Sequence, residues 1–282
     1  MSVIYILLAI SIFVAIGFFI AFIIAVKSGQ YDDSYTPSVR MLFEDELIKD
    51  KPKKTILTKK NNNYGNNPVA RKQLQDYVDK LPKDLKYWTI CQYDDGVMTD
   101  FKDLDILVFS MSKKTGVEIP LLCKPHSYEW NHSKSIFASF IGTHTHPIRE
   151  NVFNIQNKDF YISDKQHDIQ SFCDIISHSL FGLCPRGYGL NSFRIGECMQ
   201  YETIPVYISD EFISCFDANF EDYGIIIEEK DSSKIEEILK SYTDLQIVDK
   251  QLKIKDIYNE YYTYEGAFNK IKNILNANSS NP

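Results

Sequence analysis

The sequence lacks several features that would identify common kinds of protein or site. Acidic residues outnumber basic ones by 38 to 31, and the net charge of −7 argues against nucleic-acid binding, which needs a basic surface to neutralise phosphates. The six cysteines include no C-x-x-C pair, which excludes a zinc ribbon and predicts free thiols in a reducing compartment. The G-x-S-x-G elbow of serine hydrolases is absent, and no grouping of His, Cys and Asp predicts a metal site.

Charge is also absent from one long stretch near the N-terminus. Residues 3–26 carry no charged side chain, and a rise of about 1.5 Å per residue would make this helix about 36 Å long, enough to cross a hydrocarbon core of about 30 Å. The stretch lacks the basic n-region and the small-residue cleavage site of a signal peptide. We therefore expect a single transmembrane helix in a lipid bilayer.

The lysines around this stretch predict its orientation. None precedes it, whereas Lys27 borders it and further lysines follow in residues 51–60, so the N-terminus is expected outside and the rest of the chain in the cytoplasm. Gly17, Ala21 and Ala25 lie on one helix face, where small residues allow a partner helix to approach. The general abundance of Gly and Ala in membrane helices explains the same pattern equally well.

The residues that follow the apolar stretch have a specific order. Residues 27–33 read KSGQYDD, residues 38–43 read SVRMLF, and Glu44 and Asp45 come next. With the apolar stretch, residues 1–50 resemble the cbb3-type cytochrome oxidase maturation proteins named CcoS or FixS. The resemblance implies a role in oxidase maturation, contact with oxidase subunits and a place in the bacterial inner membrane. The residues alone indicate no copper site, because they offer hard carboxylates and no Cys, His or Met pair.

The remainder of the chain predicts a linker followed by an α/β fold. Residues 51–67 are rich in Lys and Asn and have too little apolar surface to fold alone. We then expect strands at residues 87–93, 105–109, 118–122, 136–141, 160–162, 180–184, 204–208 and 223–227. We expect helices at residues 72–81, 167–177, 192–200, 232–242, 254–262 and 265–277, and one beginning near Pro147. This alternation predicts a mainly parallel sheet with helices on both faces, whose ligands bind at the carboxyl ends of the strands.

A glycine-containing loop follows the expected strand at residues 180–184. Gly187 and Gly189 permit a tight turn, and Ser192 is suited to cap the next helix. The free N–H groups of such a loop and helix start suit a phosphate.

Charged side chains in residues 186–197 are also suited to bind a phosphate. Arg186 and Arg194 offer fork-shaped donors for phosphate oxygens, and Glu197 lies one helical turn after Arg194, where it could accept hydrogen bonds from a ribose. The alternative is an ordinary capped helix with a surface ion pair.

Several short sequence motifs occur in a fixed order over residues 56–268. They are Y-D-D-G at 93–96, F-A-S-F-I-G at 137–142, T-H-P-I-R-E at 145–150, C-P-R-G-Y-G at 184–189, S-F-R at 192–194 and I-P-V-Y-I-S-D at 204–210. Together they resemble the exostosin family of glycosyltransferases. The resemblance implies a GT-B architecture of two Rossmann-like halves, here with the N-terminal half shortened. Residues 68–135 would be a remnant of the acceptor half, and residues 136–282 would bind the nucleotide sugar.

The resemblance also implies a reaction and a set of residues. A nucleotide sugar, most simply a UDP-sugar, would donate its sugar to a glycan hydroxyl with inversion and without an obligatory metal or other cofactor. The implied donor-binding residues are Arg149, Arg186, Gly187, Tyr188, Gly189, Ser192, Arg194 and Glu197. Asp94 follows a strand at the expected site and is the candidate base, although a solvated Asp-Asp-Gly turn explains it as well.

Two other interpretations of the whole chain stay open. The membrane segment could carry the biological role in oxidase assembly, with a truncated and inactive glycosyltransferase behind it. The chain could equally be a recent or artefactual gene fusion.

Overall fold

The protein is described by a computed structural model that covers residues 55–57, 68–91, 94, 96–101, 103–111, 116–129 and 133–280. The chain divides into two compact units, Met1–Pro52 and Lys53–Pro282, and all described residues belong to the second. The expected transmembrane helix at residues 3–26 and its small-residue face lie outside the described residues. Among the residues that are described, none of the helices combines the length and the apolar character needed to span a membrane.

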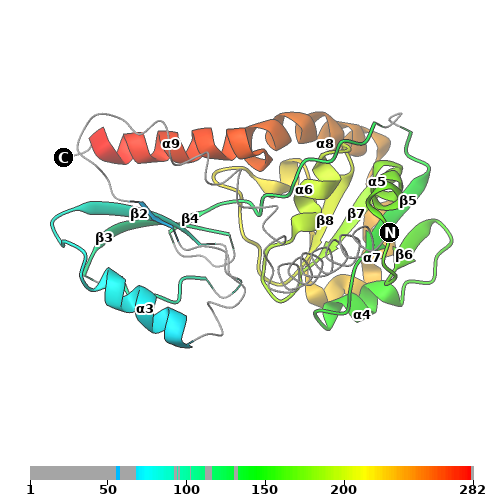
Figure 1. Ribbon diagram of the computed structural model, residues 1–282. Helices are drawn as coiled ribbons and strands as arrows, with labels where there is room; N and C mark the ends of the chain where they lie inside the picture. The colour runs from blue at the N-terminus through cyan, green and yellow to red at the C-terminus, as the bar shows by residue number, and fades with distance from the viewer. Residues whose placement is uncertain are drawn as a thin grey trace, which may run out of the picture. The chain divides into compact units, whose positions relative to one another are not determined.

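The first of two sheets is parallel and has the order β1-β2-β3-β4 (Figure 1). Its strands are β1 (Thr55–Leu57), β2 (Lys86–Cys91), β3 (Asp105–Ser110) and β4 (Val117–Glu118), and helix α3 (Pro68–Val78) connects β1 to β2. A small cluster around Leu81 and Tyr87 forms part of its core. β1 lies within residues 51–67, which the sequence predicted to be a linker. The strand was not predicted because its three residues stand in a segment rich in Lys and Asn.

The second sheet is also parallel, with the order β6-β5-β7-β8-β9. Its strands are β5 (Ile136–Ile141), β6 (Phe160–Ser163), β7 (Ser179–Pro185), β8 (Ile204–Ile208) and β9 (Ile225–Ile227). Helices α4 (Ile148–Phe153), α5 (Ile169–Ser177) and α6 (Phe193–Met199) connect the first four of them in turn. Every residue of β8 is buried, as expected for a central strand covered on both faces.

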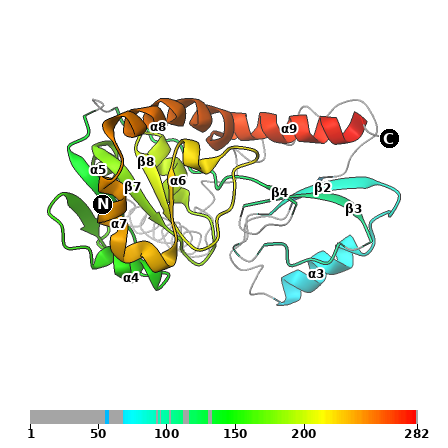
Figure 2. The same ribbon diagram turned by 180° about the vertical axis from the view of Figure 1, so that it is seen from behind.

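The C-terminal part of the chain is helical (Figure 2). It contains the 3-10 helices η1 (Phe220–Asp222) and η2 (Glu229–Lys234), the helices α7 (Ile235–Lys240), α8 (Asp244–Ile257) and α9 (Tyr264–Ser280), and the π-helical turn η3 (Tyr258–Tyr262). Helix α8 begins with a capping box between Thr243 and Gln246, which satisfies backbone groups at the helix start.

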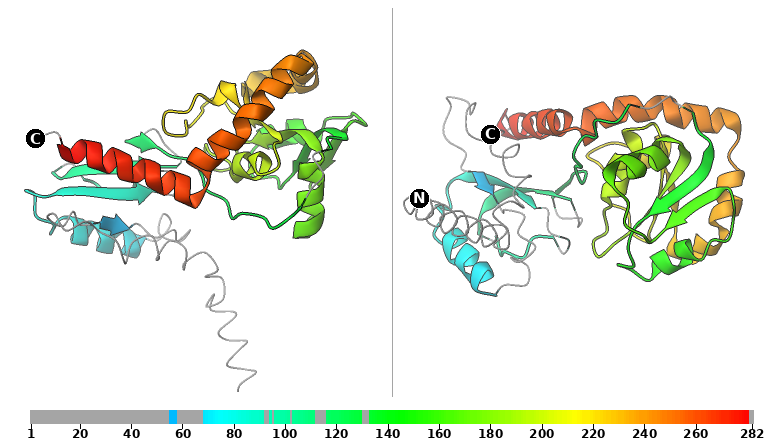
Figure 3. Two further views of the ribbon diagram at one scale, coloured as in Figure 1. Left: turned by 90° about the horizontal axis from the view of Figure 1, so that it is seen from above. Right: turned by 45° about the vertical axis from the view of Figure 1, so that its right-hand side comes forward.

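The strand order determines which helices cover each face of the second sheet. The chain leaves β5 toward β6 and leaves β7 toward β8, in opposite directions across the sheet, and right-handed crossovers then place α4 and α6 on opposite faces. In agreement, α5 contacts α6, whereas α4 contacts η2. Figure 3 shows helices on both sides of these strands. The neighbours β5 and β7 are therefore the strands at which the connections diverge.

Most of the expected elements are confirmed, but α8 begins at Asp244, ten residues before the helix expected at residues 254–262. β5 and β8 have the expected bounds, but β4 ends at Glu118 rather than at residue 122, and α3 begins at Pro68 rather than at residue 72. The expectation of a parallel α/β fold is confirmed, with its strands divided between two sheets. The prediction of free thiols is also confirmed, since none of the six cysteines forms a disulfide, and all are buried.

Close packing of α6 on β7 predicts the effect of one substitution. A Cβ atom added at Gly182 would lie 2.2 Å from Sγ of the fully buried Cys198. We expect Gly182→Ala to lower the free energy of unfolding by about 1–3 kcal/mol through overpacking. Cys198→Ala should recover part of this loss, which denaturant unfolding of both single variants and the double variant measures. Strictly additive effects would contradict the proposed clash.

Burial of Lys134 predicts a pH dependence of stability. Its Nζ lies 3.0 Å from the Ser177 carbonyl and 2.6 Å from the Tyr201 carbonyl, and burial lowers the pKa of Lys134 from 10.5 to about 7. Between pH 7 and 10.5 the Lys134 side chain is protonated in the unfolded chain and deprotonated in the folded protein. The free energy of unfolding therefore rises with pH in this range.

The free energy of unfolding is compared between the native protein and Lys134→Met. The native value minus the variant value should rise by about 1.4 kcal/mol per pH unit between pH 7.5 and 9. Urea unfolding across this range measures the difference, in which titrations common to both proteins cancel. A difference that stays constant with pH would mean that Lys134 remains protonated in the folded state.

Candidate functional site

Two loops meet at the carboxyl edge of the second sheet, where the connections of β5 and β7 diverge. Residues 142–147 connect β5 to α4, and residues 186–192 connect β7 to α6. In parallel α/β sheets ligands bind at this switch point. We call the two loops, together with Arg149 and Arg194 from the helices that follow them, the switch-point site.

The β7–α6 loop ends in the predicted helix cap. The Ser192 hydroxyl accepts a hydrogen bond from the Arg194 N–H at 3.3 Å, and the Asn191 side chain accepts one from the Ser192 N–H at 2.8 Å. Helix α6 has only 7 residues, so its dipole alone is a weak attraction for an anion. The arginine side chains provide most of the positive charge in the switch-point site.

Arg194 lies between the end of β5 and helix α5. Its Nη1 is 3.1 Å from Oε2 of Glu197, its Nη2 donates to the Ile141 carbonyl, and its Cζ is 4.5 Å from the centre of the Phe172 ring. The side chains of Arg194 and Glu197 are 17% and 21% exposed, so the pair is largely buried and is not the surface ion pair of the alternative interpretation. Glu197 thus lies on the same side of α6 as Arg194.

Arg149 joins the two loops of the site. Its Nη1 donates to the Thr143 carbonyl at 2.9 Å, and its Nε and Nη2 donate to the Arg186 and Pro185 carbonyls at 3.0 and 3.3 Å. Burial and the positive charge of Arg194 lower the pKa of Arg149. The arginine therefore holds both loops in place, and it also brings a second positive charge close to Arg194.

Several buried polar atoms in the site have no hydrogen-bond partner among the described residues. They are Oγ1 of Thr145, Nε of Arg186 and Nε of Arg194. Most buried polar groups in folded proteins are satisfied, so each exception needs an explanation, and a bound ligand is one. The sequence did not single out Thr145 as a site residue, because a lone threonine in a loop has no distinguishing pattern.

The glycines of the loop leave room for these groups. A Cβ atom at Gly187 would lie 3.2 Å from Nη2 of Arg149 and 3.4 Å from Oγ1 of Thr145. A Cβ atom at Gly189 would lie 2.8 Å from Oδ1 of Asp94. Any larger residue at position 187 or 189 would crowd these polar atoms.

Asp94 and Tyr188 are the remaining predicted site residues at the β7–α6 loop. The Asp94 carboxylate, contributed by the chain that follows β2, lies beside Gly189 and is exposed to solvent. The structure thus brings the candidate base next to the candidate donor-binding loop. The Tyr188 side chain is 77% exposed, and Nη2 of Arg186 is 3.5 Å from the Tyr188 carbonyl.

Other polar residues near this edge are paired with one another. Nδ1 of His144 is 2.5 Å from Oε1 of Glu150, and this hydrogen bond raises the pKa of His144. Nδ1 of His146 accepts a hydrogen bond from the Ile148 N–H instead. Within the described part of the chain, no group of three His, Cys, Asp or Glu residues is arranged to hold a metal ion.

Two family models match the chain. Residues 105–242 match the exostosin GT47 domain, and residues 2–45 match the cbb3-type cytochrome oxidase maturation protein family, FixS. The second match lies outside the described residues. The first includes both loops of the switch-point site.

Two curated proteins are similar to parts of the chain. One is an exostosin-1 homolog from Caenorhabditis elegans, 29% identical over 98 residues, which cover 34% of this chain and 26% of that protein. Another is a probable glucuronosyltransferase from Oryza sativa subsp. japonica, 32% identical over 100 residues, which cover 35% and 24%. The chain thus spans about a quarter of the length of these relatives.

Two solved structures show a distant likeness. They are TarM, with a TM-score of 0.44 and 11% identity over 73% of this chain and 53% of that one, and an alpha-glucosyltransferase in complex with UDP-glucose and abasic-site DNA, with a TM-score of 0.41 and 12% identity over 74% and 76%. The resemblances inferred from the residues are confirmed by the family matches: an exostosin GT47 match at residues 105–242 follows a FixS match at residues 2–45.

Proposed function

We propose that this chain is a glycosyltransferase that moves a sugar from a nucleotide sugar, specifically a UDP-sugar, to a hydroxyl of a glycan acceptor. The observation that carries the proposal is the switch-point site, where three arginines and the buried Thr145 hydroxyl lie at the carboxyl ends of β5 and β7. The exostosin GT47 match over the same residues supports it.

The arginines suit the charge that develops in such a reaction. As the acceptor hydroxyl attacks the anomeric carbon, the bond from that carbon to the diphosphate oxygen breaks, and the diphosphate leaves with the bonding electrons. Arg186 would contact this diphosphate directly through its Nε, which has no hydrogen-bond partner among the described residues, while Arg149 and Arg194 add positive charge beside it. The arginines would thus stabilise the leaving group through donors that are already in position.

The remaining predicted site residues have more local roles in this proposal. Gly187 and Gly189 leave room for the polar side chains of the site to lie against the loop, and Ser192 fixes the start of α6. Glu197 is paired with Arg194 and would orient it as well as accept from a ribose hydroxyl. The exposed Tyr188 ring is available to stack on a base or a sugar.

The acceptor side of the reaction is assigned to the first sheet. The two parallel sheets would be the halves of a GT-B architecture, with residues 68–135 as a shortened acceptor half and residues 136–282 as the donor half. Asp94 comes from the first half and lies beside the donor loop. In this position it would accept the proton of the attacking hydroxyl, with inversion at the anomeric carbon.

The chain would act at the cytoplasmic face of a bacterial inner membrane. The FixS match supports a link to the membrane, and the uncharged stretch at residues 3–26 would span the bilayer with the N-terminus outside. Gly17, Ala21 and Ala25 would face a partner helix. This topology would place the enzyme in the cytoplasm, where nucleotide sugars are made.

Binding of the donor tests the proposal. A UDP-sugar at 100 times its Kd should stabilise the full-length protein by about 2.7 kcal/mol in a thermal-shift titration with UDP- and GDP-sugars. Arg186→Ala should lose this stabilisation, whereas Arg71→Ala, which removes an exposed arginine of α3, should keep it. Stabilisation by none of the nucleotide sugars, from a protein that unfolds cooperatively, would rule out a working donor site.

Two further variants separate the roles within the site. Thr145→Val should weaken donor binding but leave the ligand-free protein as stable or more stable, because it removes a buried hydroxyl that has no partner. Asp94→Asn should bind the donor normally and lower the rate of transfer to the acceptor by about 10²–10⁴-fold. Unchanged transfer by Asp94→Asn would exclude Asp94 as the base.

A second function is favoured by the FixS match. Residues 2–45 would act in the maturation of a cbb3-type oxidase, in contact with oxidase subunits, and the domain behind them would be inactive or joined by an artefactual fusion. Deletion of residues 1–50 should then abolish cbb3-type oxidase activity in cells while glycan synthesis is unaffected. Full oxidase activity in the deletion strain would exclude this role.

A further inference from the structure

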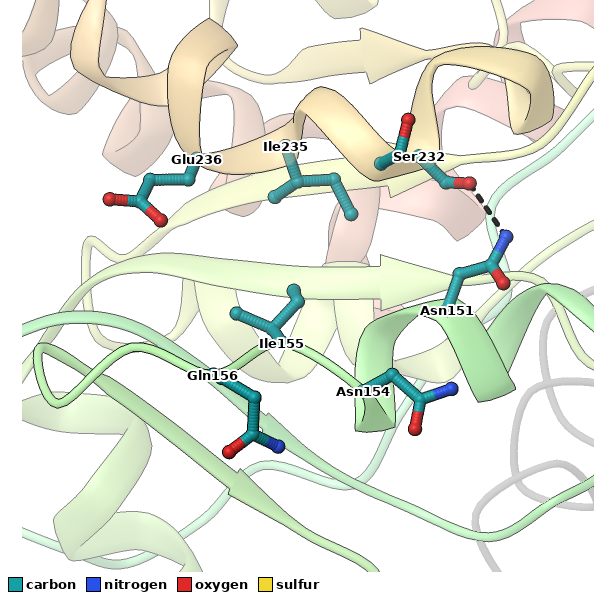
Figure 4. Close-up of a pocket in the computed structure, with 8 residues that line it drawn as sticks. Asn151, Asn154, Ile155, Gln156, Ser232, Ile235 and Glu236 are labelled. Atoms are coloured by element: carbon teal, nitrogen blue, oxygen red, sulfur yellow. Dashed lines mark hydrogen bonds between the residues drawn. The ribbon is translucent and has the colours of Figure 1, made fainter.

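A pocket lies on the face of the second sheet that is covered by α4. It has a volume of about 410 Å³ and is bounded by α4 and the residues after it on one side, and by η2 and α7 on the other (Figure 4). This size is within the usual range for small-molecule sites. The residues of the switch-point site do not line the pocket, although Arg149 lies on the same helix.

The chemistry of the pocket differs from that of the switch-point site. Its polar side chains are neutral amides and hydroxyls, and no Lys, Arg or His lines it. The single ionisable residue is Glu236, whose Oε1 is 2.5 Å from Nζ of Lys240. Since Lys240 neutralises Glu236, the lining has no net charge and offers no unpaired cation to an anion such as a phosphate, so it favours an uncharged ligand.

Some polar groups of the pocket are paired and others are available. Nδ2 of Asn151 donates to Oγ of the buried Ser232 at 2.8 Å, which joins α4 to η2 at one end of the pocket. The side chains of Asn154, Gln156 and Ser233 are exposed to solvent, so their polar groups are open to a ligand. These amides and this hydroxyl can both donate and accept, as the hydroxyl groups of a sugar do.

The pocket also has an apolar part. Ile155 and Ile235 extend toward each other from its two sides in Figure 4, where the half-buried Ile155 is open to a ligand and the buried Ile235 forms the base of the pocket. A sugar ring presents C–H groups on its faces and hydroxyls around its rim. Isoleucine methyl groups beside available amides and a hydroxyl are complementary to both parts of such a ring.

We propose that this pocket binds an uncharged oligosaccharide at a site separate from the donor site. Binding of the saccharide does not depend on the proposed donor reaction. Its identification as a distant part of the acceptor glycan rests on the proposed function. Arg149 lies in the first turn of α4 and Asn154 follows its last, so a saccharide bound here would contact the same short helix that carries Arg149.

Titration calorimetry with defined tetrasaccharides tests the proposal. The full-length protein, in a detergent without a sugar headgroup, is titrated with cellotetraose, chitotetraose and the anionic tetragalacturonate. One of the two neutral probes should bind, and tetragalacturonate should bind at least tenfold more weakly. Asn154→Ala should weaken neutral binding about tenfold, and Ser233→Tyr should block it by filling the pocket. Gln170→Ala removes an exposed amide from α5, on the opposite face, and should leave binding unchanged.

The outcomes separate this proposal from the donor reaction. The proposal would be overturned if neither neutral probe binds, or if tetragalacturonate binds as tightly as the neutral probe. It would also be overturned if Asn154→Ala and Ser233→Tyr both bind the neutral probe as the native protein does. Thermal unfolding of each variant shows whether it is folded. Arg186→Ala should retain the saccharide while it loses the nucleotide sugar. Saccharide binding by a protein that binds no nucleotide sugar would disprove the donor site and leave this inference intact.

Discussion

The Arg149 guanidinium connects the ends of two neighbouring strands, and the geometry of the switch-point site depends on this connection. It donates to the carbonyls of Thr143, after β5, and of Pro185 and Arg186, at the end of β7. Without Arg149, these carbonyl oxygens would accept hydrogen bonds from the other arginines of the site, in competition with a ligand. Because the half-buried Arg149 satisfies these carbonyls, Nε of Arg186 and the hydroxyl of Thr145 are left without a partner among the described residues.

The same arrangement concentrates positive charge in a chain whose formal net charge is −7. Arg149 and Arg194 are close enough for the charge of Arg194 to lower the pKa of Arg149, and Glu197 neutralises only one of them. Two like charges in a partly buried place repel each other, and a dianion between them would relieve the repulsion. A site of this kind therefore favours a ligand with two negative charges over a ligand with one.

How far the sequence predicts the structure depends on whether the signal is local. β5 and β8 could be bounded from sequence because each is a short and mostly apolar run, and the Ser192 cap follows from a short-range preference of helix starts. β1 was missed because pairing with β2, and not its own composition, makes residues 55–57 a strand. Nothing local marks Thr145 as buried without a partner, and nothing local places Asp94 beside Gly189, because tertiary packing produces both.

The burial of all six cysteines gives the protein an internal reporter of its own opening. A thiol reagent in solution reaches Cys91 only when the first sheet opens, and reaches Cys184 or Cys198 only when β7 and α6 separate. The rate at which each thiol becomes labelled therefore follows the local opening of its own sheet. The two halves of the chain can in this way be compared for kinetic stability within one native molecule, without an introduced probe.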